Sequence, residues 1–349
     1  TTGTDNVAIG EASLDAVTSG SDNTAVGDNA AGAITTGDNN TAVGSSALLV
    51  NTTGEKNTAI GAIAGTAVTT GARNTLIGYA AGDAITTGDD NVALGDGALT
   101  SATTASDNVA IGAAALNANT TGTDNVAVGS QAGIVVTTGS DNTLIGDGAA
   151  DALTTGNNNT AVGSGSLSAT TTAAGNTAVG KNAMLSNTTG ANNTAVGLQA
   201  LNGNTTADDN TAVGMNALVS NTTGATNTAV GASALQENTT ASDNTAVGFE
   251  SLLDNTTGTN NTAVGKRSGY NITTGDDNTA IGQEALFTAT TASDNTAVGF
   301  QALYSNSSGA SNAAMGHNAL FNNTTAANNT AVGFSALNAN TTGSENTAV

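Results

Sequence analysis

The sequence predicts an all-β protein, a parallel β-solenoid or β-roll of about twenty 17-residue coils. Three observations lead to this prediction. Glycine recurs at every seventeenth position from Gly10 to Gly333, with no insertion or deletion. An asparagine lies four positions before each of these glycines, and an aliphatic residue or Met lies directly before it. A further large aliphatic residue occupies one of two nearby positions in most repeats. Such a strict period is typical of coils that stack on one another.

We number each coil from its asparagine, so that Asn23 is slot one and Gly27 is slot five. Slots two to four, residues 24–26 in this coil, have β-branched residues at both ends and predict a short strand. The glycine after them permits a tight corner with positive φ. The slot-one asparagines would form a ladder, because each amide can donate and accept along the axis. The framework residues expected in the first four coils are Asn6, Asn23, Asn40, Asn57, Gly10, Gly27, Gly44 and Gly61.

Slots three and four are both apolar, although neighbouring residues of a strand face opposite sides of the sheet. Slot three is Ala or Leu in every coil, and slot four is Val, Ile, Leu or Met. A coil with one solvated face would not need two apolar faces. We therefore expect either that the strand is sandwiched within the coil stack or that its alanine face packs on another chain.

The second half of the coil shows a compensation between slots nine and twelve. Where slot nine is Leu, as at Leu48, slot twelve is polar or Ala, as at Asn51. Where slot nine is Gly or Ala, as at Gly65, slot twelve is Val, Ile or Leu, as at Val68. Only the first coil has a large aliphatic residue at both slots. Because packed interiors conserve volume, the two slots should reach the same interior space.

The charge and composition exclude several classes of function. The chain has 5 Lys and Arg residues against 27 Asp and Glu residues, so we expect no nucleic-acid partner, since that binding needs a basic surface. Cysteine is absent, which excludes disulfides and thiolate metal sites. No apolar run approaches the roughly 20 residues of a membrane helix, and no membrane insertion is expected. The serines and carboxylates have no base partner, so we expect no enzymatic activity.

We expect residues 1–349 to form a single continuous solenoid domain. Solenoids need terminal caps, and neither end supplies one, because the chain starts at slot thirteen and stops at slot four. The uncapped sequence is therefore expected to be part of a longer fibre.

Acidic residues gather in the two slots before the asparagine. The same slot is filled in four successive coils by Asp90, Asp107, Asp124 and Asp141. At a spacing of about 4.8 Å, neighbouring carboxylates repel one another, and hard oxygen ligands suit Ca²⁺. The sequence thus predicts calcium as a possible cofactor at these four residues. The alternative is that Asp and Asn are good turn residues whose side chains extend into water.

The aromatic residues occupy only slots six and ten, and most lie in the second half of the chain. An apolar stripe confined to one half indicates a contact surface, either for subunit packing or for a glycan or other target. The predicted interface residues are Phe249, Tyr270, Phe287, Phe300, Tyr304, Phe321 and Phe334.

The segment Asn6-Val7-Ala8-Ile9-Gly10 resembles the head repeat of YadA-like trimeric autotransporter adhesins. The pattern Asn-Thr-Ala-Val-Gly-x-x-Ala-Leu with Asn-Thr-Thr-Gly is similar to arrays in bacterial and phage tail-fibre-like proteins. The resemblance covers essentially the whole chain. It implies a left-handed parallel β-roll, three chains wound into one fibre, and exposure at a cell or virion surface.

We therefore predict that the protein is a non-enzymatic shaft or head of an extracellular fibre of a bacterium or phage. Its expected partner is further copies of the same chain, in a homotrimer or a fibre polymer. One alternative is an adhesin that binds a host surface, a protein receptor or a carbohydrate through the aromatic residues. Another is an ice-binding solenoid with a threonine array. The adjacent threonines of slots thirteen and fourteen, such as Thr35 and Thr36, should face opposite sides. This arrangement leaves a single outward threonine column at those slots.

Overall fold

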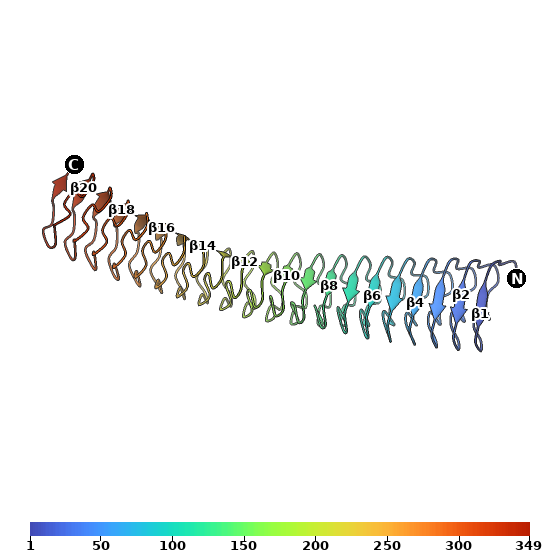
Figure 1. Cartoon of the computed structure of the whole chain (residues 1–349). Coiled ribbons are helices and arrows are strands. Elements are labelled where there is room, and N and C mark those ends of the chain that lie inside the picture. Colours follow the sequence, from blue (N-terminus) through green and yellow to red (C-terminus); the bar gives the residue numbers. More distant parts are fainter. The chain divides into compact units, whose positions relative to one another are not determined.

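The computed structural model describes residues 1–349 and is all-β, with 21 short strands and no helix. It forms two compact units, Thr1–Gly175 with β1–β10 and Asn176–Val349 with β11–β21. Within each unit the strands follow one another in sequence order, one per coil (Figure 1). The predicted parallel β-solenoid is confirmed. The strands are β1 Val7–Ile9, β2 Thr24–Val26, β3 Thr41–Val43, β4 Thr58–Ile60, β5 Thr75–Ile77, β6 Val92–Leu94, β7 Val109–Ile111, β8 Val126–Val128, β9 Thr143–Ile145, β10 Thr160–Val162, β11 Thr177–Val179, β12 Thr194–Val196, β13 Thr211–Val213, β14 Thr228–Val230, β15 Thr245–Val247, β16 Thr262–Val264, β17 Thr279–Ile281, β18 Thr296–Val298, β19 Ala313–Met315, β20 Thr330–Val332 and β21 Thr347–Ala348.

The strands pair in parallel with a shift of one coil. In the second unit, for example, Thr194 of β12 lies opposite Thr211 of β13. The Thr211 N–H donates to the Asn227 carbonyl of the next coil, and the Gly214 N–H donates to the Val196 carbonyl of the previous one, both at 2.8 Å. Three-residue strands would not hold by themselves. They persist here because β-branched residues favour the extended conformation and both neighbours pair with them.

The alanine face of each strand is the inner face. Ala212 of slot three is fully buried, whereas the slot-four side chains Val230, Leu94 and Ile9 are 37%, 42% and 60% exposed. Both expectations for this strand are therefore wrong: it is not sandwiched, and its alanine face does not pack on another chain. The alanine is small because the coil interior is narrow and already holds the aliphatic residue of slot nine or twelve.

The structure confirms that slots nine and twelve share one interior space. A methyl group added at Gly65, in slot nine, would lie 3.4 Å from Val68 Cγ2 of slot twelve and 3.0 Å from Leu48 Cδ2 of the previous coil. It would also lie 2.7 Å from Leu76 Cδ1, in slot three of the next coil. Slot three therefore contributes to the same volume, and Leu76 replaces the usual alanine where slot nine is glycine. The repeat pattern alone did not indicate this third contributor, because slot three is alanine in most coils.

The corners depend on left-handed backbone conformations. Gly231 of slot five has φ +139, and a methyl group there would lie 2.4 Å from the carbonyl oxygen of Gly248 in the next coil. Slots nine and seventeen also have positive φ but carry side chains, as at Leu235 (φ 49) and Asp243 (φ 62). A non-glycine residue in this region costs of the order of 1–3 kcal/mol. Burial of the leucine and the inter-coil hydrogen bonds offset that cost.

A ladder of buried asparagines runs beside the strands in slot one. Asn40 donates its side-chain N–H groups to Asn23 Oδ1 of the previous coil at 3.1 Å and to the Gly54 carbonyl of its own coil at 2.9 Å. Its Oδ1 accepts the Asn57 backbone N–H at 3.0 Å. Because a buried polar group without a partner costs about 1–3 kcal/mol, this fully bonded arrangement explains why asparagine recurs in slot one of every coil.

A second ladder occupies slot twelve in the second unit. Asn204, Asn221, Asn238 and Asn255 each donate to the slot-twelve Oδ1 of the previous coil at 2.8–3.0 Å. The ladder stops where the next coil has Ile272 in this slot, and the buried Asn255 Oδ1 is left without a hydrogen-bond partner. Slot twelve thus alternates between a polar ladder and an apolar core residue.

Candidate functional surfaces

The surface of the protein shows columns of identical slots and no enclosed site. There is no ligand pocket, and no group of three or more His, Cys, Asp and Glu side chains could hold a metal ion. The only histidine, His317, lies between Phe300 and Phe334, with ring centroids 5.0 and 5.2 Å apart. No helix of the structure is long and apolar enough to cross a membrane.

The first column is the acidic turn of slots sixteen and seventeen. Asp90, Asp107, Asp124 and Asp141 lie in one exposed column with φ between 58 and 59. This left-handed conformation suits aspartate better than most residues, which accounts for its frequency here. No three carboxylates converge on one point. The calcium predicted at these residues therefore stays a prediction, without a preformed chelating cluster.

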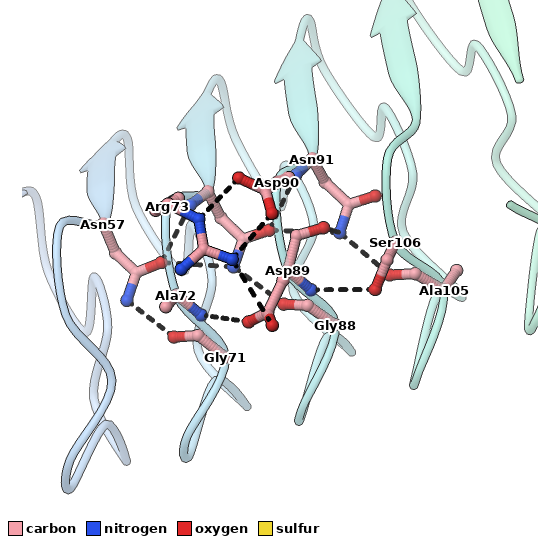
Figure 2. Close-up of polar contacts among 11 residues, drawn as sticks. Asn57, Gly71, Ala72, Arg73, Gly88, Asp89, Asp90, Asn91, Ala105 and Ser106 are labelled. Atoms are coloured by element: carbon pink, nitrogen blue, oxygen red, sulfur yellow. Dashed lines mark hydrogen bonds and ion pairs between the residues drawn. The ribbon is translucent and has the colours of Figure 1, made fainter. Parts of the chain in front are cut away.

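Arg73 begins this acidic column in the first unit (Figure 2). Its Nε and Nη2 atoms each lie 2.7 Å from a carboxylate oxygen of Asp90, and Nη2 is 3.6 Å from Asp89. The hydrogen bonds from Arg73 lower the pKa of the Asp90 carboxyl. Arg73 was missed in the sequence analysis, although the signal was present: it fills slot seventeen one coil before Asp90, so opposite charges meet along the stack.

Slot-sixteen acidic residues have a structural role. The Ala72 N–H donates to Asp89 Oδ1 at 2.7 Å, and the Asp89 N–H donates to Ser106 Oγ at 3.0 Å (Figure 2). The same bond joins the Thr259 N–H to Asp276 Oδ1 at 2.7 Å. These side chains supply acceptors where the chain turns and no strand partner is available. Asp and Ser therefore occur in slot sixteen because their side-chain oxygens accept hydrogen bonds from backbone N–H groups of the previous coil.

The predicted interface residues form two columns. In slot ten, Tyr270, Phe287, Tyr304 and Phe321 stack with ring centroids 5.0–5.1 Å apart. In slot six, Phe249, Phe300 and Phe334 are 46%, 39% and 77% exposed. The slot-ten rings cover one another's faces, and the Arg267 guanidinium lies over the Tyr270 ring at the start of the column, 5.6 Å from its centroid. The slot-six column is the more accessible of the two.

The outer side of the strands is a further surface, which we call the strand face. In β11–β18 of the second unit it consists of slots two and four, and these slots hold only Thr, Val and Ile. The slot-two residues are half-buried except the exposed Thr296, and the slot-four residues are half-buried or exposed, as at Ile281 with 39% exposed. The members of the strand face are Thr177, Thr194, Thr211, Thr228, Thr245, Thr262, Thr279, Thr296, Val179, Val196, Val213, Val230, Val247, Val264, Ile281 and Val298.

Comparisons with known proteins do not assign a family. No protein-family model matches the chain, and no curated protein matches it significantly.

Proposed function

We propose that this protein is a non-enzymatic structural element, the shaft or head of an extracellular fibre of a bacterium or phage. The observation that supports this proposal most is the continuity of hydrogen bonds from coil to coil within each unit. The surface location rests on the resemblance of the Asn-Thr-Ala-Val-Gly repeat to fibre and adhesin arrays. The left-handed coil and the three-chain assembly rest on the same resemblance and are part of the proposal.

Each coil is tied to the next at several points around its circumference. Between neighbouring coils of the second unit, Thr211 N–H donates to the Asn227 carbonyl at 2.8 Å, and Asn227 Nδ2 donates to Asn210 Oδ1 at 3.2 Å. In the second half of the coil sequence, the Thr222 hydroxyl donates to the Thr239 carbonyl at 2.9 Å. A coil cannot tilt or slide on its neighbour without breaking several of these bonds. Repetition of the same bonds would make each unit stiff.

The partner in this proposal is a second copy of the chain, and its contact surface is the slot-six aromatic column. Phe249, Phe300 and Phe334 are exposed in the second unit, and aromatic residues are enriched in protein interfaces. The runner-up is an adhesin that binds a glycan or receptor here. A sugar ring stacks on an open aromatic face, and in slot six the rings of Phe300 and Phe334 already pack against His317 between them, with ring centroids 5.0 and 5.2 Å apart. This geometry favours packing between copies.

The test is the mass of the full chain in solution, measured by light scattering. We expect three times the 33.3 kDa of one chain, or larger polymers. The triple variant Phe249→Ser, Phe300→Ser, Phe334→Ser should shift the mass toward one chain, and serine already occupies slot six at Ser45, Ser130 and Ser164.

The matched control is Tyr79→Ser, which removes an exposed slot-six aromatic residue from the first unit. Its mass should equal that of the wild type. A wild-type protein that stays a single chain at all concentrations would contradict assembly with copies of itself.

A further inference from the structure

We propose that the strand face of β11–β18 binds ice, and that its ligand is the ordered water at the surface of an ice crystal. This inference goes beyond the structural role proposed above and does not depend on it. It rests on four properties of the face: its regular spacing, its unpartnered hydroxyl groups, its rigid methyl-rich side chains and its lack of charge.

The spacing of the face is set by the sheet. From β11 to β18 threonine pairs with threonine and Val or Ile with Val or Ile, without a shift of register. Each of the eight slot-two N–H groups donates to the next coil at 2.8 Å. Neighbouring strands are therefore about 4.8 Å apart, and slots two and four of one strand about 6.6 Å apart. The result is a two-column lattice of threonine and valine.

The threonine hydroxyls of this lattice have no partner in the protein. None of the slot-two Oγ1 atoms in β11–β18 makes a hydrogen bond within the chain. Slot thirteen shows the contrast, because there the Thr205 hydroxyl donates to the Thr222 carbonyl at 3.0 Å, and the Thr239 hydroxyl to the Thr256 carbonyl at 3.0 Å. The same residue type is thus engaged in slot thirteen and free in slot two. Free hydroxyls at regular intervals can each hold one water molecule.

The side chains around these hydroxyls order water in a second way. Threonine, valine and isoleucine have restricted χ1 angles, so their methyl groups keep fixed positions. Apolar groups limit the orientations of the water beside them, and no charged residue occurs in slots two and four to compete for that water. The flanking slots hold buried asparagines and glycines, which raise no side chain above the face. Water over the face should therefore be ordered by the hydroxyl and methyl groups together, at the regular spacing of the slots, which is the property that ice binding requires.

A second copy of the chain is a poorer occupant of this face. A dry contact across it would bury the slot-two hydroxyls, and a buried hydroxyl left without a hydrogen-bond partner is unfavourable. Slots thirteen and fourteen are also poorer than the strand face, because the slot-thirteen hydroxyls donate to carbonyls of the next coil, which leaves one exposed column in slot fourteen, as at Thr223, Thr240 and Thr257. That single column provides a matched control surface.

The experiment measures ice recrystallisation inhibition by the full chain and two triple variants. In the strand-face variant, Thr211→Tyr, Thr228→Tyr and Thr245→Tyr place bulky rings in slot two of three successive coils. In the control variant, Thr223→Tyr, Thr240→Tyr and Thr257→Tyr place the same rings in slot fourteen of the same coils. Circular dichroism checks that both are folded, and tyrosine favours strands.

We expect the wild type and the control variant to inhibit recrystallisation equally and the strand-face variant to need at least about ten times more protein. If the strand-face variant does not fold, Thr211→Val, Thr228→Val and Thr245→Val replaces it. Valine occupies slot two naturally at Val92, Val109 and Val126, and loss of the hydroxyls should again weaken inhibition. A wild type without inhibition, or an equal loss of inhibition in both tyrosine variants, would overturn the proposal.

Discussion

Individual carboxyl groups on the coil respond to their position in opposite ways. Burial raises the pKa of the Asp254 carboxyl, and the neighbouring charge of Glu237, one coil earlier in the same slot, raises it further. Burial also raises the pKa of the Asp83 carboxyl. The hydrogen bonds from Arg73 lower the pKa of the Asp90 carboxyl. At neutral pH, Asp254 therefore opposes folding in its charged form, and Asp90 supports it.

Asp254→Asn should stabilise the protein at pH 7. Because the pKa of Asp254 is raised in the folded state, the folded chain holds the proton more tightly than the unfolded chain. Its unfavourable contribution therefore grows as pH rises from the unfolded pKa through the folded one. The variant should gain about 0.5 kcal/mol at pH 7, a small value because the half-buried carboxyl is still screened by solvent. Thermal unfolding at pH 3 to 8 should show the gain disappearing at the acidic end.

Asp90→Asn is the control of opposite sign. The lowered pKa of Asp90 means that its favourable contribution is present above the unfolded pKa and is lost as pH falls through the folded one. This variant should be slightly less stable than the wild type at pH 7 and equal to it in strong acid. Equal pH profiles for both variants would contradict these assignments.

At the scale of one coil, the interior has a set volume that slots three, nine and twelve fill together. In coil 261–277, slot nine is Gly269 and slot twelve is Ile272. A methyl group at Gly269 would lie 3.1 Å from Ile272 Cδ1 and 2.9 Å from Leu252 Cδ2. The previous coil has the opposite arrangement, with Leu252 in slot nine and Asn255 in slot twelve. At the junction of these two arrangements, Asn255 of slot twelve has Ile272 as its neighbour in the next coil, and its Oδ1 is left without a hydrogen-bond partner.

Gly269→Leu and Ile272→Asn should each destabilise the protein, and the double variant should recover most of the loss. The leucine alone overfills the interior, at a cost of about 1–3 kcal/mol. The asparagine alone leaves a cavity, at a cost of about 2–5 kcal/mol. Together they copy the arrangement of the previous coil, and the new asparagine gives the Asn255 Oδ1 a donor.

The measurement is a thermal double-mutant cycle, with an expected coupling of about 1–3 kcal/mol. The control pair is Gly65→Leu with Ile272→Asn, whose sites lie in different units. Simple additivity in the test pair would show that the slots do not share one space.

At the scale of the whole molecule, the net charge of −22 is distributed in columns that repeat along the stack. Two unit charges about 4.8 Å apart repel by roughly 1–3.5 kcal/mol at effective dielectric constants between 80 and 20. The slot-seventeen aspartates are exposed, so that dissolved ions can reach and screen them. Stability should therefore depend on ionic strength.

Added salt should raise the thermal unfolding temperature, and NaCl and CaCl₂ of equal ionic strength should act alike. Screening requires no chelating group, and no cluster of three acidic side chains is present. The variant Asp107→Asn, Asp124→Asn should unfold at a higher temperature in low salt and respond less to salt. A stabilisation specific to Ca²⁺ that this variant abolishes would instead establish the calcium site at Asp90, Asp107, Asp124 and Asp141.

The 17-residue period by itself determined most of the fold. It set the strand positions, the parallel register and the location of the asparagine ladder, because stacked copies of one unit place each slot beside itself. It also determined the shared volume of slots nine and twelve, since a stacked interior that varies in sequence must keep its volume. Each of these inferences compares one coil with the next, and the sequence contains twenty such comparisons.

Only the tertiary structure decided which side of each strand lies inside. Alternation in a strand places slots three and four on opposite faces, but it does not state which face the rest of the coil covers. That choice buries Ala212 and exposes Val213 only in part, and it leaves the hydroxyl of Thr211 free. The left-handed conformation of residues such as Leu235 could not be predicted from the sequence either. Its backbone strain is offset only by burial of the side chain and by hydrogen bonds to neighbouring coils. The sequence determined what each slot contains, and the path of the chain around the coil determined what each slot faces.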